Sequence, residues 1–112
     1  MRQYVLILDL KDDPILIKEY IEYHQNVWPE IEESLKESGI LTLKIFRFKN
    51  HLTMLLEVSD SFSFEKKAAL DLNNPKVQEW ENLMWKYQSP VSGAPQGEKW
   101  VLMEEIYQLN TN

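Results

Sequence analysis

The sequence predicts an α+β fold in a single domain that spans residues 1–112. Three runs rich in Val, Ile, Leu and Phe, at residues 2–10, 40–48 and 51–58, have the composition of β-strands. Apolar residues at spacings of three and four indicate helices between and after these runs. A chain of 112 residues has the usual size of one domain, so these strands and helices are expected to share one core.

A short acidic turn joins the first strand to the first helix. Strand 2–10 is followed by Asp12 and Asp13, where a helix is expected to begin. Pro14 then occupies the first helical position, which accepts proline because its N–H would have no intrahelical partner. The apolar stripe of this helix consists of Ile17, Tyr20, Ile21, His24, Trp28, Ile31 and Leu35.

Pro29 interrupts this helical pattern. Proline removes a backbone donor and clashes with the preceding turn, so we expect a kink or break before residue 29. The helix should resume over residues 30–36 and end at Gly39, because glycine readily adopts the left-handed conformation that follows many helices.

The next two strands form a predicted hairpin. Residues 40–48 and 51–58 are separated only by Lys49 and Asn50, which is the length of a tight hairpin turn. Asparagine tolerates a positive φ, so Asn50 is the residue expected to adopt it.

Two further helical segments follow the hairpin. Asp60 and Ser61 are candidate caps for a helix over residues 62–72. Asn74 and Pro75 predict a second start, with asparagine as cap and proline as first helical residue. The stripe of this second segment consists of Val77, Trp80, Glu81, Met84 and Tyr87.

The end of the chain is predicted to add a loop and a last strand. Residues 88–98 hold two prolines and two glycines and are expected to form a loop, and residues 99–108 are expected to form the strand.

The resulting order, βαββαβ, is the ferredoxin-like arrangement, with both helical segments on one face of an antiparallel sheet. Residues 4–8 are apolar without alternation, so both sheet faces should be covered. A second copy of the chain is the simplest cover, and we expect a homodimer.

Charge and composition exclude several classes of function. The net charge is −6, from 12 basic and 18 acidic residues, so no binding to nucleic acid or to an anionic membrane is expected. The absence of cysteine excludes disulfides and thiol nucleophiles. No apolar run has membrane-spanning length, and the first residues lack a cleavage site of small residues, so a cytoplasmic protein is expected. The scattered glycines form no phosphate loop and the histidines no metal pattern; we expect neither cofactor nor metal.

His24 is the main candidate for chemistry. It lies on the apolar stripe one turn after Tyr20 and one turn before Trp28. Such a histidine can be a core residue that bonds a backbone carbonyl, or it can belong to a sugar site, where aromatic rings stack on the pyranose and imidazole exchanges protons near neutral pH. His51 stands beside a turn and is expected to be a polar surface residue.

Trp80 and Glu81 form a second candidate pair, with Trp85 about one turn further on. They can be an ordinary amphipathic helix, with Trp80 buried and Glu81 at its edge. They can equally be an indole that stacks on a sugar beside a carboxylate that accepts its hydroxyls.

These motifs resemble the L-rhamnose mutarotase family. The segment YIEYHQNVWPE over residues 20–30 is similar to the family hallmark of a Tyr, a His four residues later, and Trp-Pro-Glu. Supporting matches are Ser38-Gly39, Ile45-Phe46, Trp80 with Met84, and the closing EIYQL at 105–109. The resemblance covers nearly the whole chain.

This resemblance implies a dimeric α/β barrel that interconverts sugar anomers without cofactor or metal. It places the proton donor at His24, and substrate binding at Tyr20, Trp80 and position 81, where this chain has Glu in place of a second tryptophan. Another binding tyrosine of the family falls on Leu43. The Glu81 version, with Gln88 and the segment GEKW at 97–100, looks like a branch associated with L-fucose.

We therefore expect an isomerase of carbohydrate metabolism. It should interconvert the α and β anomers of a 6-deoxy-hexose, L-rhamnose first and L-fucose next, by general acid–base ring opening. Two alternatives share the expected fold: a cofactor-free monooxygenase, and a small-molecule binding module without catalysis.

Overall fold

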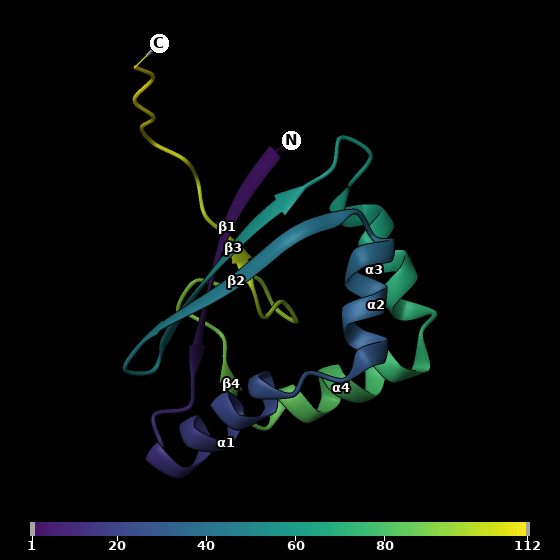
Figure 1. Cartoon of the computed structure of the whole chain (residues 1–112). Helices are drawn as coiled ribbons and strands as arrows, with labels where there is room; N and C mark the ends of the chain where they lie inside the picture. Colours follow the sequence, from purple (N-terminus) through teal and green to yellow (C-terminus); the bar gives the residue numbers. More distant parts are fainter. Residues whose placement is uncertain (1, 112) are drawn as a thin grey trace.

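One antiparallel sheet with helices on one side forms the body of the molecule in the computed structural model, which describes residues 2–111 (Figure 1). The elements in chain order are β1 Arg2–Leu10, α1 Pro14–Gln25, α2 Pro29–Glu37, β2 Ile40–Phe48, β3 His51–Val58, α3 Phe64–Leu72, α4 Pro75–Trp85, β4 Gln88–Ser89 and β5 Val101–Leu102. The predicted ferredoxin-like α+β class is confirmed. Within residues 2–111, no helix is long and apolar enough to cross a bilayer.

Local signals in the sequence define both long helical segments. The Oδ1 atom of Asp13 accepts hydrogen bonds from the backbone N–H groups of Ile15 and Leu16, at 2.9 and 3.1 Å, and so caps α1. The predicted break before Pro29 is confirmed, because α1 ends at Gln25 and α2 begins at Pro29. The predicted cap and proline at Asn74 and Pro75 are confirmed in the same way at the start of α4.

Two local predictions are wrong. Helix α3 begins at Phe64 with Ser63 as its cap, because Phe62 turns into the core, where it is 3% exposed. In the hairpin, Lys49 adopts the positive φ, of 53°, while Asn50 binds the end of β1. The Asn50 carbonyl accepts from the Leu10 N–H at 2.7 Å, and the Asn50 side chain donates to the Leu10 carbonyl at 3.2 Å.

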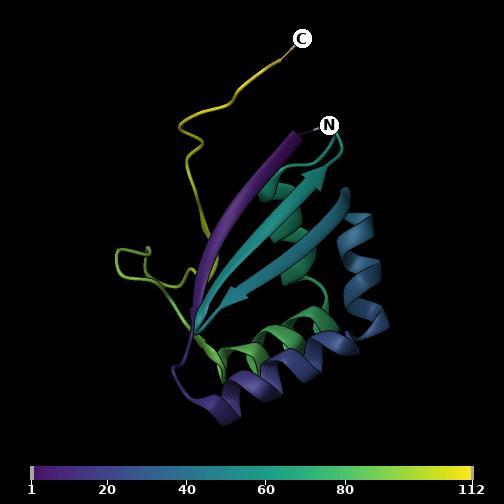
Figure 2. The same cartoon turned by 60° about the vertical axis from the view of Figure 1, so that its left-hand side comes forward.

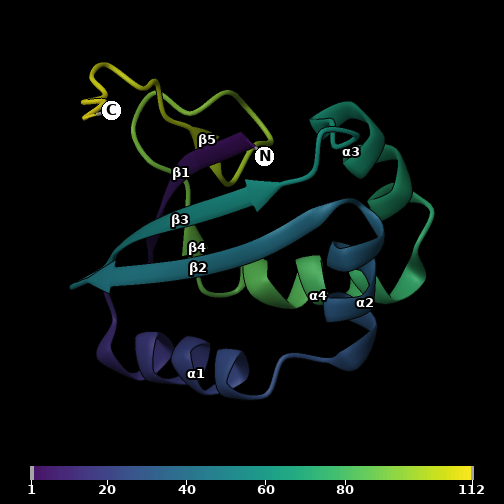
Figure 3. The same ribbon diagram turned by 45° about the horizontal axis from the view of Figure 1, so that its top comes forward.

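The edge of the sheet beside β1 differs from the prediction. The strand order is β2-β3-β1-β4, and β5 also pairs with β1, so two short pieces share this edge (Figure 3). Leu10 pairs with Gln88 in β4, and Leu6 pairs with Leu102 in β5. The predicted loop over 88–98 therefore begins inside a strand, and the predicted strand over 99–108 shortens to two residues. After Met103, whose N–H donates to the Val5 carbonyl at 2.7 Å, the chain leaves the sheet (Figure 2).

The two faces of the sheet have different surroundings. Leu6, Leu8 and Leu10 of β1 are buried against the helical side, where all four helices lie (Figures 1 and 2). The alternate residues of β1, such as Ile7, point to the opposite face. The core and the enclosed space of the fold therefore lie between the sheet and the helices.

Candidate active site

A cavity of about 360 Å³ lies between the sheet and the helices. All four helices, the three long strands, Gln88 of β4 and residues 99–100 contribute to its wall. The wall is mainly apolar, and its polar side chains are Tyr20, His24, Ser34, Lys67, Asp71, Glu81, Gln88 and Lys99. An enclosed apolar space with a few polar groups is the usual form of a small-molecule site.

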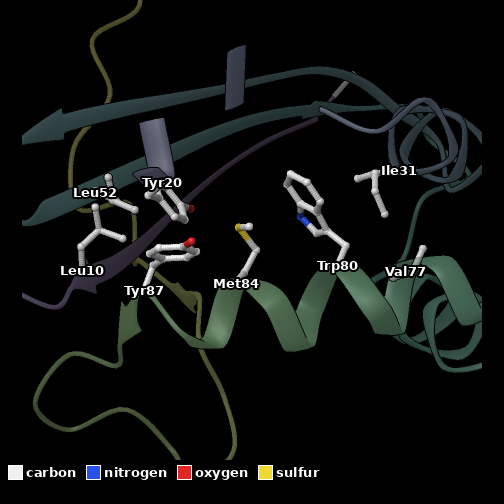
Figure 4. Packing of buried hydrophobic residues seen from close by; sticks show 8 residues of the cluster. All are labelled: Leu10, Tyr20, Ile31, Leu52, Val77, Trp80, Met84 and Tyr87. Atoms are coloured by element: carbon white, nitrogen blue, oxygen red, sulfur yellow. The ribbon is translucent and has the colours of Figure 1, made fainter. Parts of the chain in front are cut away.

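Helix α4 supplies one side of this cavity and helix α1 another. Trp80 and Met84 project from α4 toward the space that Tyr20 of α1 also enters (Figure 4). The 3.6-residue period of α4 places Val77, Trp80 and Met84 on one buried face. A four-residue spacing likewise places Tyr20 and His24 on the same face of α1.

His24 has the geometry of a base that is neutral at pH 7. Its Nδ1 atom lies 2.8 Å from the carbonyl oxygen of Tyr20. Since a carbonyl only accepts, Nδ1 holds the proton, and Nε2 keeps a free lone pair. Burial lowers the pKa of His24 below its ordinary 6.5, and the backbone hydrogen bond opposes this only in part. His24 therefore bonds a backbone carbonyl, as the first of its two alternatives expected, and it also lines the cavity.

Aromatic rings hold the imidazole of His24 in place. The Tyr20 ring lies 4.3 Å from it, centroid to centroid, and the Trp80 ring meets it edge-on at 5.6 Å. Trp28 does not line the cavity; it packs edge-on against Trp80 at 5.1 Å and so supports that ring from behind. The predicted row of Tyr20, His24 and Trp28 therefore becomes a row in which Trp80 replaces Trp28.

Tyr20 is a buried hydrogen-bond donor. Its side chain is 3% exposed, and burial raises the pKa of its hydroxyl to about 12. The interaction with Gln88 lowers this pKa and so opposes the effect of burial, and the charge of Glu81 raises it. The hydroxyl consequently keeps its proton at every physiological pH.

Glu81 is a hydrogen-bond acceptor held by Lys99. The Nζ atom of Lys99 lies 2.5 Å from Oε2 of Glu81 and donates to the Glu81 carbonyl at 3.2 Å. The Lys99 side chain is 11% exposed and the Glu81 side chain 42% exposed, so the pair lies at the border between cavity and solvent. Nζ also lies 5.0 Å from the centre of the Trp85 ring. This arrangement fixes the direction of the carboxylate.

The structure brings the four predicted site residues, Tyr20, His24, Trp80 and Glu81, around one cavity. His51 lies at the surface, as expected, where its Nδ1 atom is 2.8 Å from the Asp9 carboxylate. Residues 2–111 contain no cluster of three His, Cys, Asp or Glu side chains that would hold a metal ion.

Sequence reasoning assigned no role to Gln88 or Lys99. Both belong to the segments that look like the L-fucose-associated branch, and this was the only signal in the sequence that pointed to them. Leu43, where the family has a binding tyrosine, does line the cavity.

The fold and the cavity define a ferredoxin-like α+β protein with a small-molecule pocket between its sheet and its helices. A family model described as L-rhamnose mutarotase matches residues 3–109, and the chain belongs to this family. An L-fucose mutarotase from Xanthomonas campestris pv. campestris is 40% identical over 112 residues, covering 98% of this chain and 90% of that protein. An L-rhamnose mutarotase from Listeria monocytogenes is 32% identical over 76 residues, covering 66% of this chain and 65% of that protein.

The fold is also found in a solved structure. The crystal structure of an L-rhamnose mutarotase from Formosa agariphila matches with a TM-score of 0.71 and 22% identity, covering 98% of this chain and all of that one. The shared fold includes the sheet and helices that enclose the cavity.

Proposed function

We propose that this protein is a sugar mutarotase that interconverts the α and β anomers of a 6-deoxy-hexose at the cavity beside His24. The observation that supports this most directly is the free Nε2 atom of a neutral histidine on the wall of a cavity, in a chain of the mutarotase family. Family membership does not favour the monooxygenase or the binding module.

The proposed reaction begins with His24 as a base. Nε2 takes the proton of the anomeric hydroxyl, and the bond between C1 and the ring oxygen O5 breaks. The imidazolium then gives the proton to O5, which it can reach because O1 and O5 share the same carbon. The product is an open-chain aldehyde. Rotation about the C1–C2 bond and the reverse steps close the ring on the other face. The proton balance is complete without a metal, a nucleophile or a nicotinamide.

The remaining site residues bind the sugar in this proposal. The hydroxyl of Tyr20 donates to a sugar oxygen, and the Trp80 ring stacks on the apolar face of the pyranose. Glu81 accepts a sugar hydroxyl from its position against Lys99. General acid–base catalysis supplies about 10²–10⁴-fold acceleration, which suits a reaction that already proceeds slowly in water.

L-Fucose is the first sugar to test. The relative named for L-fucose aligns with nearly the whole chain, whereas the Listeria protein named for L-rhamnose aligns with two thirds of it. This observation favours L-fucose over the L-rhamnose that the family resemblance placed first. Saturation-transfer NMR on each sugar would detect exchange between the anomers directly. Line broadening of a sugar without exchange would instead support the binding module.

Glu81→Gln should narrow the preference between the two sugars by about tenfold. L-Fucose and L-rhamnose differ in the orientation of ring hydroxyls, and a hydrogen bond to a charged group contributes roughly 1.5–3 kcal/mol. The carboxylate should favour the sugar that directs a hydroxyl toward it. Competition between the two sugars, measured as the ratio of their kcat/KM values, tests this.

The matched control for this variant is Glu79→Gln on the same helix. Glu79 is exposed and pairs with Lys76 at 3.3 Å, and it does not line the cavity. The Glu79 variant should keep the wild-type ratio. An unchanged ratio in the Glu81 variant would show that position 81 has no part in the choice.

We also propose that the protein is a homodimer that buries the face of the sheet opposite the helices. Ile7, Thr53 and Phe46 are cross-strand neighbours on that face, and Phe46 and Phe48 are 57% and 69% exposed. An obligate interface of this kind buries more than about 2,000 Å² in total. The apolar pattern of β1 supports this proposal, because a second copy is the simplest cover for this face.

Light scattering should find twice the mass of the 13.4 kDa chain. Phe48→Lys should shift the protein toward the monomer, because a lysine ammonium is costly to bury in an apolar interface. Leu72→Lys, at an equally exposed position on α3, should leave the dimer intact. A wild-type protein that is monomeric at micromolar concentration would contradict the proposal.

The cytoplasmic location and the lack of nucleic-acid partners stay predictions from the sequence. The acidic net charge of −6 and the absence of cysteine support them. Cell fractionation with an antibody against the chain tests the location.

A further inference from the structure

Gln88 is a buried polar side chain on the wall of the cavity. It is 4% exposed and belongs to β4, where it pairs with Leu10 of β1. Cross-strand neighbours point to the same face of a sheet, and Leu10 lies in the core on the helical side. Gln88 therefore points toward the helices, and it lines the cavity together with Tyr20, His24 and Glu81.

The two ends of the Gln88 amide have different surroundings. The Gln88 side chain lies near the Tyr20 hydroxyl and lowers its pKa, as a donor to that oxygen would. Its Oε1 atom is buried and has no hydrogen-bond partner anywhere in residues 2–111. Buried acceptors in native proteins nearly always have a donor, so an unpaired acceptor on a residue that lines the cavity points to a donor on the ligand.

Gln88 also differs from the other acceptor near the cavity. The Glu81 carboxylate is already bound by Lys99 and lies partly in solvent. Gln88 is neutral and buried, so it needs no counter-ion. The backbone of β4 pairs with β1 through main-chain atoms, which do not depend on the Gln88 side chain.

We propose that Gln88 is a sugar-binding residue whose Oε1 atom accepts a hydrogen bond from a hydroxyl of the pyranose. Its Nε2 atom holds the Tyr20 hydroxyl, so that the Tyr20 O–H donates to a neighbouring sugar oxygen. The pair then recognises two adjacent oxygens, one as a donor and one as an acceptor. This inference rests on the proposed sugar mutarotase function and adds a residue that selects the hydroxyl pattern of the sugar.

The test is Gln88→Met, which keeps the length of the side chain and removes both polar atoms. The thermal unfolding midpoint should stay the same or rise, because a buried acceptor without a partner is lost. The sugar concentration for half-saturation, measured by ligand-observed NMR, should rise about tenfold or more. A purely structural glutamine would produce the opposite pattern, a lower midpoint with unchanged half-saturation.

Gln78→Met on α4 is the matched control. The Nε2 atom of Gln78 donates to the Asp71 carbonyl at 2.9 Å, and its side chain does not line the cavity. This variant should lower the unfolding midpoint and leave half-saturation unchanged. Gln88→Asn, which keeps a buried amide but withdraws it by one methylene, should fold and also bind the sugar more weakly.

The outcomes separate this inference from the proposed function. Wild-type half-saturation in a folded Met or Asn variant overturns the role of Gln88, while anomer exchange by the wild type still supports the mutarotase. Weaker binding by both variants supports Gln88 even if the wild type only binds the sugar without exchange. A wild type that binds neither L-fucose nor L-rhamnose overturns both.

Discussion

His24→Ala should lower the rate of anomer exchange by about 10²–10⁴-fold while the protein stays folded. The variant removes Nε2, which is the free lone pair that takes the proton of the anomeric hydroxyl in the proposed reaction. It also removes the hydrogen bond of Nδ1 to the Tyr20 carbonyl, but that contact lies within α1 and contributes little to the core. Exchange rates from saturation-transfer NMR, with circular dichroism of the same samples, measure both effects.

The other histidine of the chain is the control for this prediction. His51 pairs with Asp9 at the surface and does not line the cavity. His51→Ala should therefore exchange the anomers at the wild-type rate. Wild-type exchange by a folded His24→Ala protein would remove His24 from the mechanism.

Lowering the pH should also reduce the rate of anomer exchange strongly. The base form of His24 persists below pH 6.5, because burial lowers the pKa of the imidazole. The enzyme-catalysed rate should thus be constant from pH 8 to about 6.5, and it should then fall about tenfold for each pH unit below the pKa of His24. Two units below that pKa, roughly 1% of the activity should remain. The spontaneous rate at each pH must be subtracted, because acid also accelerates mutarotation in water.

The free energy of unfolding should also decrease as the pH falls. In the unfolded chain His24 takes up its proton near pH 6.5, while in the folded protein it stays neutral to a lower pH. The unfolded state therefore binds more protons in this interval, and the free energy of unfolding decreases as pH falls from about 6.5 to the folded pKa. Below the folded pKa this contribution is constant.

Thermal unfolding measured at each pH separates the effect of pH on stability from its effect on the rate. The share of His24 in the midpoint should decline between about pH 6.5 and the folded pKa of His24 and then stay constant, whereas the rate declines steeply only below that pKa. His24→Ala should lose the steep dependence of the rate and this share of the dependence of stability. A wild-type rate that already falls above pH 7 would contradict a histidine with a lowered pKa as the base.

Local chemistry made much of the fold predictable from the sequence. The cap at Asp13, the break at Pro29 and the restart at Pro75 follow from backbone donors and φ restrictions that act within a few residues. Hydrophobic runs identified the three long strands, because each is paired along most of its length. The bounds of the last two strands, β4 and β5, were not predictable in this way. Each of them exists only where the chain pairs with two residues at the edge of β1.

The candidate site was likewise predictable only in part. Helical periodicity placed Tyr20 and His24 on one face of α1, and the resemblance to the mutarotase family singled out these two residues together with Trp80 and Glu81 as site candidates. The sequence did not determine that Trp80 replaces Trp28 beside the imidazole, because this depends on how α4 packs against α1. Gln88 and Lys99 line the cavity because residues 88–102 begin and end in strands that pair with β1. Only the tertiary structure decided their place, because pairing between distant segments is set by the shared sheet and core and not by any local pattern.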